Sequence, residues 1–133
     1  MPETIVEDPQ FWQFRSEVAD WPHGIYDGDT FRLDVHQGFS QRMAAAKVRL
    51  ADVDCPSIKG AERPQGLAAR DRVRELLEPP TELAIMPRAG DPQKYGRYLV
   101  DVHFTPYPPA LNPDGWHDLA AVLLEEGHAV PYE

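Results

Sequence analysis

Two aspartates separated by one glycine stand near the start of the chain, in the stretch YDGDTFRLDV over residues 26–35. Asp-Gly is the strongest short signal for a hairpin turn, but a turn needs only one aspartate, Asp27. The second carboxylate, Asp29, brings a like charge close to the first, and a bound cation would relieve that repulsion. The stretch therefore has two interpretations: a turn in which Asp29 or Thr30 bonds to the backbone, or a cation site.

Three further stretches carry side chains suited to phosphate chemistry: VRLADVDCPS (48–57), DPQKYGR (91–97) and LEEGHAVPY (124–132). Arginine suits phosphate because its planar fork donates two hydrogen bonds to one phosphate and keeps its charge. Taken singly, each stretch also has a purely structural interpretation. Arg49 alone is typical of a strand surface, Arg97 of a partner for an acidic surface, and KYGR of a turn with Gly96 at positive φ.

The elements that must position these side chains follow from hydrophobic periodicity. Alternation of apolar and polar residues predicts strand, turn and strand over residues 23–35, with further strands over 43–54, 81–87 and 97–104. With two helices, this order favours an α+β fold. A closed antiparallel five-stranded OB-fold β-barrel with packed helices fits better than a Rossmann sheet, because helical crossovers do not join all neighbouring strands.

Two helices are predicted from apolar residues on one face and from their end signals. The first lies within residues 62–80, where Ala69, Val73, Leu76 and Leu77 share a face and two prolines follow. The second covers residues 119–126, with Asp118 as a candidate cap and Gly127 after its end. The domain is expected over residues 21–133, preceded by an acidic N-terminal arm, residues 1–20, that carries the aromatic stretch FWQF.

Composition limits the function classes. The 133 residues suit one domain, and 42% hydrophobic residues are enough for a core. The net charge of −9 argues against a broad nucleic-acid-binding face but leaves room for a small phosphate pocket. The single cysteine, Cys55, rules out an internal disulfide and is expected as a buried filler, and the histidines lack zinc spacing. No membrane span or secretory signal is visible, so a cytoplasmic protein is expected.

Four motifs in this order resemble the staphylococcal nuclease (thermonuclease-like) family. They are DGDT, then RL followed by D-x-P, then KYGR, and then a glycine and an alanine near a tyrosine. The order and spacing match over residues 21–133, and the ending is most similar to short phage-encoded members, for which the host cytoplasm is the expected location. The resemblance implies an OB-fold barrel and calcium-dependent (Ca²⁺) hydrolysis of phosphodiester bonds. It implies DNA or RNA as the partner, single-stranded or frayed, with no membrane; the sequence leaves the oligomeric state open.

The resemblance also implies the calcium ligands, position by position. Asp29 and Asp54 correspond to the carboxylates that bind calcium directly. The backbone carbonyl of Cys55 would be a further ligand, and Asp27 would act through a water molecule. Calcium is a hard cation that takes oxygen ligands of these kinds.

Catalytic and substrate-binding residues follow in the same way. Arg49 and Arg97 match the two catalytic arginines of the family. Lys94 and Tyr95 match residues that contact a nucleotide phosphate, and Tyr132 matches a nucleotide-contacting tyrosine within one residue of register.

One position departs from the family pattern. The family carries D-x-P-E where this chain has DCPS, so Ser57 stands in place of the glutamate that activates or positions the attacking water. Glu62, five residues on, is a candidate substitute. The sequence therefore leaves two functions open: a slow calcium-dependent nuclease, or a catalytically silent module that keeps the barrel and binds nucleic acid or protein.

Overall fold

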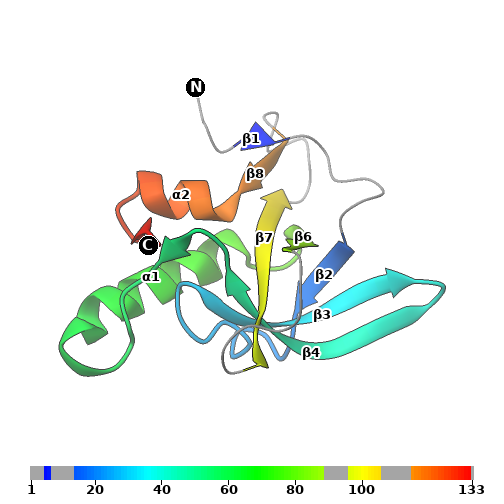
Figure 1. Cartoon of the computed structure of the whole chain (residues 1–133), viewed down its shortest axis with the longest axis horizontal. Helices are drawn as coiled ribbons and strands as arrows, with labels where there is room; N and C mark the ends of the chain where they lie inside the picture. The colour runs from blue at the N-terminus through cyan, green and yellow to red at the C-terminus, as the bar shows by residue number, and fades with distance from the viewer. Residues whose placement is uncertain (1–4, 7–13, 89–95, 106–114, 133) are drawn as a thin grey trace.

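Five strands close into a barrel, and two helices pack against it (Figure 1). The computed structural model describes residues 5–6, 14–88, 96–105 and 115–132. Around the barrel the strand order is β7-β4-β3-β2-β6, and β6 pairs with β7 to close it. The strands are β2 (Phe14–Val18), β3 (Thr30–Gly38), β4 (Gln41–Leu50), β6 (Glu82–Pro87) and β7 (Tyr98–Thr105). The predicted α+β class and five-stranded barrel are confirmed.

The barrel is mixed, whereas the sequence predicted an antiparallel one. β4 pairs in parallel with β7, with Arg49 opposite Leu99, while the other barrel pairs are antiparallel. Parallel neighbours need a long crossover between them. Here the connection from β4 to β7 contains the helix α1 (Arg63–Leu76) and the strand β6, so β7 returns beside β4 in the same direction.

The first strand of the barrel lies earlier in the chain than expected. β2 falls inside the segment assigned to an N-terminal arm, yet it pairs with both β3 and β6. The residues predicted as a strand before the Asp-Gly turn form turns up to Gly24 and one isolated antiparallel bridge, Ile25 with Phe31. Pro22 has no N–H to donate to a ladder, and its carbonyl accepts a 3.0 Å hydrogen bond from the N–H of Ile25. Phe11 and Trp12 lie outside the described residues, so the role of the arm stays a prediction.

Both predicted helices are present. α1 follows a short 3-10 turn, Gly60–Glu62, and buries Ala69 and Val73. α2 (Leu119–Glu125) ends before Gly127, whose φ is 80°. Figure 1 shows both helices on the side of the barrel away from the tip of the β3–β4 hairpin. No helix in the described part of the chain is long and apolar enough to cross a membrane.

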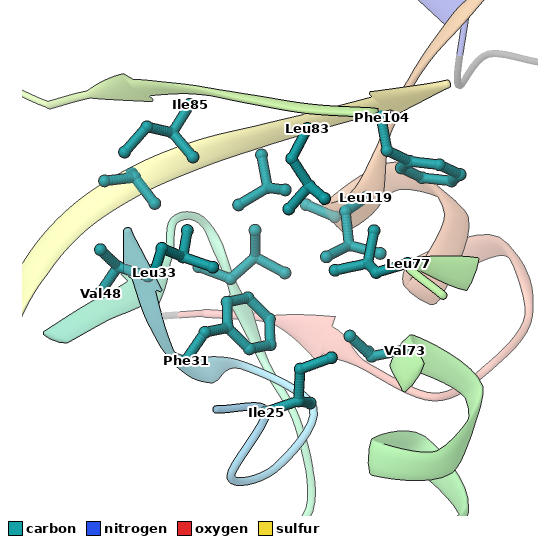
Figure 2. Close-up of a cluster of buried hydrophobic side chains, with 14 of the residues drawn as sticks. Ile25, Phe31, Leu33, Val48, Val73, Leu77, Leu83, Ile85, Phe104 and Leu119 are labelled. Carbon is teal, nitrogen blue, oxygen red and sulfur yellow. The ribbon is translucent and has the colours of Figure 1, made fainter. Parts of the chain in front are cut away.

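The core fills the barrel and extends under the helices (Figure 2). Alternate residues of β3 point inward, which is the period-2 pattern that predicted the strand. The side chains that Figure 2 labels are at most 3% exposed: Ile25, Phe31, Leu33, Val48, Val73, Leu77, Leu83, Ile85, Phe104 and Leu119.

Short strands outside the barrel complete the fold. β5 (Val53–Asp54) pairs with β9 (Val130–Pro131), and β1 (Ile5–Val6) pairs with β8 (Trp116–Asp118). The β5–β9 pairing is a separate two-stranded sheet that holds Val130 and Pro131 beside the segment after β4, whereas β8 also pairs with β7. The strand predicted over residues 43–54 is divided by a turn at residues 51–52 into β4 and β5. The sequence did not predict β1, β8 and β9, because runs of two or three residues carry no periodicity.

Candidate functional site

The turn that leads into β3 is built from Asp27, Gly28 and Asp29. The N–H of Asp29 donates a 3.0 Å hydrogen bond to Asp27 Oδ1, so Asp27 makes the turn contact. A Cβ at position 28 would lie 2.7 Å from Cys55 Sγ and 3.1 Å from Ala69 Cβ. Glycine therefore lets the turn approach the Cys55 segment and α1, and it leaves the second carboxylate facing the site.

Asp29 is buried at 5% exposure, and each of its oxygens has a partner. Its Oδ2 accepts a 2.9 Å hydrogen bond from the backbone N–H of Cys55. Its Oδ1 accepts a 3.1 Å hydrogen bond from the Thr30 hydroxyl. Its backbone carbonyl accepts from the N–H of Leu50 at 2.8 Å. These hydrogen bonds hold the buried carboxylate in one orientation. A buried negative charge also needs a neighbouring positive charge to compensate it.

The compensating charge comes from Arg49. Its Nη2 lies 3.4 Å from Asp29 Oδ2 and 3.3 Å from Asp54 Oδ1. Its Nη1 donates to the backbone carbonyls of Leu50 and Val53 at 3.0 Å and 3.2 Å. The Arg49 side chain is 13% exposed, whereas that of Asp54 is 56% exposed. The Arg49 guanidinium therefore bridges a buried carboxylate and an accessible one, and backbone carbonyls at the end of β4 and in the segment after it hold the guanidinium in place.

The second predicted arginine, Arg97, joins the same group. Arg97 lies just before β7, and its Nη1 donates a 3.2 Å hydrogen bond to Thr30 Oγ1. Thr30 in turn donates to Asp29, so a chain of two hydrogen bonds connects Arg97 with the buried carboxylate. Thr30 also lies directly opposite Arg49 in the β3–β4 ladder. Three segments distant in sequence, residues 27–30, 49–55 and 97, thus meet at one end of the barrel.

The environment of Asp27 favours a neighbouring positive charge. Burial and the negative charge of Asp29 raise the pKa of Asp27 to about 6. A cation near these carboxylates would favour their charged forms and offset both effects. Cys55 follows the same logic: burial, and then the charges of Asp29 and other nearby carboxylates, raise the pKa of its thiol to about 12. The thiol therefore stays protonated and is no nucleophile near neutral pH, as the sequence predicted.

Ser57 lies at the rim of the site. Its hydroxyl accepts a 3.0 Å hydrogen bond from the N–H of Lys59, and its own N–H donates to Glu62 Oε1 at 3.3 Å. Glu62 and Asp54 line one hollow of about 320 Å³ with Ser57 and Cys55. The loop thus brings a carboxylate to the neighbourhood of Ser57.

The predicted substrate-binding residues fall into two groups. Tyr132 is described: Arg49 Cζ lies 4.8 Å from the centroid of its ring, and the side chain is 61% exposed. Its N–H donates to the Asp52 carbonyl at 3.0 Å, which places it beside the predicted arginine. Lys94 and Tyr95 lie outside the described residues, so their roles stay predictions.

A comparison with protein-family models matches residues 47–133, more than half of the chain, to the staphylococcal nuclease homologue family. The chain belongs to this family. A search of the curated proteins returned no match. Membership in the staphylococcal nuclease family indicates a nuclease-related function.

The staphylococcal nuclease match starts at Lys47, and this boundary affects how each site residue is assigned. Arg49, Asp54 and Arg97 lie within the match, whereas Asp29 lies before it. Asp29 is assigned to the site from the structure of the barrel, because the turn before β3 lies beside the end of β4. Geometry therefore adds a residue to the site that the matched segment does not contain.

The donor set fits a calcium ion. Asp29 and Asp54 each offer a carboxylate oxygen to the Arg49 guanidinium, which brings the two carboxylates to one place. All the candidate donors are oxygens, which calcium prefers, and water supplies many of its ligands in proteins. Among the described residues, no group of three or more His, Cys, Asp or Glu side chains is placed to hold a metal ion.

Sequence reasoning undervalued two residues of this site. The sequence indicates Thr30 as a turn residue, whereas in the structure its hydroxyl bridges Asp29 and Arg97. Its signal was the position directly after the second aspartate. Glu62 is a candidate substitute by its distance along the chain alone, and the 3-10 turn brings it within hydrogen-bond distance of the Ser57 N–H.

Proposed function

We propose that this protein is a calcium-dependent nuclease that hydrolyses phosphodiester bonds of DNA or RNA and is slow at neutral pH. The observation that carries the proposal is the Arg49 guanidinium held 3.4 Å from Asp29 and 3.3 Å from Asp54. A structural ion pair needs one carboxylate, whereas this arrangement adds a second, accessible one and a second arginine. The arrangement suits an anionic substrate held between a metal and two guanidinium groups.

Asp29 and Asp54 are the residues that would hold calcium directly, with Asp27 through water and the Cys55 carbonyl as a further ligand. Bound calcium would neutralise negative charge on the phosphate oxygens. The buried Asp29 is oriented in advance by the backbone N–H of Cys55. The exposed Asp54 leaves the site open to solvent and substrate.

Arg49 and Arg97 would bind and orient the phosphate. The two hydrogen bonds from Arg49 Nη1 to backbone carbonyls fix the plane of its guanidinium. Thr30 positions Arg97 in a similar way from β3. Groups held before the reaction stabilise developing charge without reorganising, and this is the usual source of large effects on turnover.

The weak part of the site is proton transfer from the attacking water. A serine hydroxyl is far too weakly basic to act as a general base near pH 7, and general-base assistance typically contributes about 10²–10⁴-fold. Glu62 is the carboxylate beside Ser57, but its Oε1 accepts a hydrogen bond from the Ser57 N–H. We therefore expect slow cleavage that rises with pH, as hydroxide replaces the missing base.

Cleavage of a labelled oligonucleotide in calcium and in EDTA, over a range of pH, tests the proposal. Wild-type protein should cleave only with calcium, and Asp54→Asn should lower the rate at least about tenfold, because loss of even an outer-shell partner of a metal ligand typically costs about 10–100-fold. Asp71→Asn is the matched control, because Asp71 is 63% exposed on α1 and outside the site. Folded wild-type protein that cleaves at no pH would favour the catalytically silent binding module.

A further inference from the structure

A second feature of the barrel surface lies beside the candidate site. Among the residues that the structure describes, a hollow of about 550 Å³ is lined by four basic side chains and no acidic one. Its floor comes from β3 and β4, and its rim from the turn before β3 and the loop after β5. The residues that matter are Tyr26, Thr30, Arg32, Lys47, Lys59 and Arg97.

This concentration of positive charge runs against the rest of the chain. The whole protein has 13 lysines and arginines against 22 aspartates and glutamates, with a net charge of −9. Elsewhere on the described surface, arginines commonly pair with acids: Arg15 with Glu82, and Arg72 with Glu126. In the part of the chain that the structure describes, no carboxylate within ion-pair distance accompanies Arg32, Lys47 or Lys59.

Two of these cations face each other directly. Arg32 on β3 and Lys47 on β4 are register partners in the antiparallel ladder, and both are exposed. Like charges directly opposite one another destabilise a strand pair. The same ladder places Thr30 opposite Arg49, one step along the same outward face. A repulsive pair beside a phosphate-binding arrangement is expected where an anion bridges the two cations.

The hollow is continuous with the candidate site. Thr30 belongs to both, since its hydroxyl donates to Asp29 and accepts from Arg97. Arg97 also lines the hollow. A strand of nucleic acid with one phosphate at Arg49 and Arg97 would therefore place its neighbouring phosphate toward Arg32 and Lys47.

We propose that this hollow binds the flanking phosphates of a single nucleic-acid strand, with Arg32 and Lys47 as the principal contacts and Lys59 at the rim. The inference rests on the proposed function for the position of the cleaved phosphate. The positive charge outside the metal site then makes affinity depend on substrate length. A ligand with one phosphate contacts only Arg49 and Arg97, whereas a longer strand also contacts the hollow.

Tyr26 gives the hollow a surface for a base. Its side chain is 46% exposed, and its backbone is fixed because its N–H donates to the Thr30 carbonyl at 3.1 Å. Single strands bind to grooves that combine cations with aromatic rings on which bases stack. A base paired in a duplex would not present its face to the ring, so Tyr26 favours single-stranded or frayed substrates.

An acidic peptide is the other ligand that four cations could attract. The observations favour nucleic acid, because the hollow adjoins a site built for one phosphate and carries an exposed aromatic ring. The two ligands are separable by experiment. A glutamate peptide of equal charge should bind the wild-type protein at least about tenfold more weakly than the oligonucleotide, and equal affinity would overturn the assignment.

The test is binding of phosphorothioate hexathymidylate, which resists cleavage, and of the single-phosphate dinucleotide TpT, both by fluorescence anisotropy in calcium. Arg32→Gln/Lys47→Gln should lower hexamer affinity about tenfold or more at 50 mM salt and leave TpT affinity within about twofold. The slope of log affinity against log salt should fall by about 0.7 for each phosphate that the variant no longer neutralises.

The matched control is Arg42→Gln/Arg70→Gln, which removes the same charge from two positions outside the hollow, one exposed (Arg42) and one half-buried (Arg70). It should retain hexamer affinity and the salt slope. Tyr26→Ala should weaken hexamer binding at least about fivefold, the low end for loss of one stacked base, while Tyr26→Phe should not. Unfolding curves check that each variant folds, and the Arg32/Lys47 variant should be no less stable than wild type, because a repulsive pair is removed.

The outcomes separate this inference from the proposed function. Hexamer affinity equal in the Arg32/Lys47 variant and wild type would overturn the inference, whatever the cleavage assay shows. No hexamer binding by wild type would overturn it too. Selective loss of hexamer binding in a protein that never cleaves would support the hollow while removing the nuclease.

Discussion

The backbone N–H of Cys55 donates a 2.9 Å hydrogen bond to the buried Asp29 carboxylate, although the two residues are 26 positions apart. The bond comes from the main chain, so no replacement of Cys55 other than proline removes the donor. It joins the turn before β3 to the segment after β5 and sets the direction of the carboxylate. The candidate metal position therefore depends on the two segments meeting at the end of the barrel. It does not depend on the Cys55 thiol.

Asp29 and Asp54 should differ in their effects on stability although both contribute to calcium binding. Asp54→Asn should abolish measurable calcium binding and change the free energy of unfolding by less than about 1 kcal/mol, because the side chain is 56% exposed. Asp29→Asn should also abolish binding and cost about 1–3 kcal/mol, because it leaves the Arg49 guanidinium with one carboxylate. Calorimetric titration and denaturant unfolding measure both quantities. Unchanged calcium affinity in both variants would refute the ligand assignment.

Ser57→Glu should raise calcium-dependent cleavage at pH 7 by at least about tenfold, because it restores a carboxylate at the position where the family has one. Turnover of a labelled oligonucleotide measures the effect, and Ser57→Gln, of similar size without a charge, is the control. Equal rates in Ser57→Glu and wild type would make Glu62 the next candidate for the general base. Loss of wild-type activity in Glu62→Gln would then place the base in the loop.

Gly28→Ala should destabilise the protein and weaken calcium binding together. The new Cβ would lie 2.7 Å from Cys55 Sγ and 2.9 Å from Cys55 Cβ, and overpacking of this kind typically costs about 1–3 kcal/mol. Relief should be partial in Gly28→Ala/Cys55→Ala, because the sulfur is gone and the Cβ remains. Urea unfolding of the two single variants and the double variant gives the coupling energy. Full additivity of the two changes would show that this contact does not limit the turn.

His103 should make stability fall as pH drops below neutral. Burial lowers the pKa of His103 from 6.5, against the weaker opposing effects of Asp118 and Asp101. The unfolded chain therefore binds a proton at a pH where the folded protein does not, so the free energy of unfolding decreases as pH falls through 6.5. The loss is at most about 1.4 kcal/mol per pH unit for one group.

The His103 contribution is measured as the difference in slope between wild type and His103→Gln from pH 7 to pH 5. The variant should have the shallower slope. Burial also raises the pKa of Asp118, which opposes the trend, so only the difference between the proteins reports His103. Identical slopes in the two proteins would contradict the expected role of burial at His103.

Local signals in the sequence determined much of the fold. The apolar face of Ala69 and Val73, continued by Leu77 at the C-cap, predicted α1, since burial of one helix face follows directly from a 3.6-residue period. The alternation of apolar and polar residues predicted β3 in the same way. Four short motifs in order identified the family, because their joint spacing is specific even though each alone is a common turn or strand end.

Tertiary structure decided what depends on pairing between distant segments. The parallel pairing of β4 with β7, and the place of β2 in the barrel, depend on chain crossovers that no local period encodes. Register made Arg32 and Lys47 face each other, and closure of the barrel end brought Asp29 to Arg49 and Thr30 to Arg97. The sequence thus specified which side chains had suitable chemistry, while the folded chain determined which of them meet, because side-chain contacts across a barrel are set by strand order and register rather than by spacing along the chain.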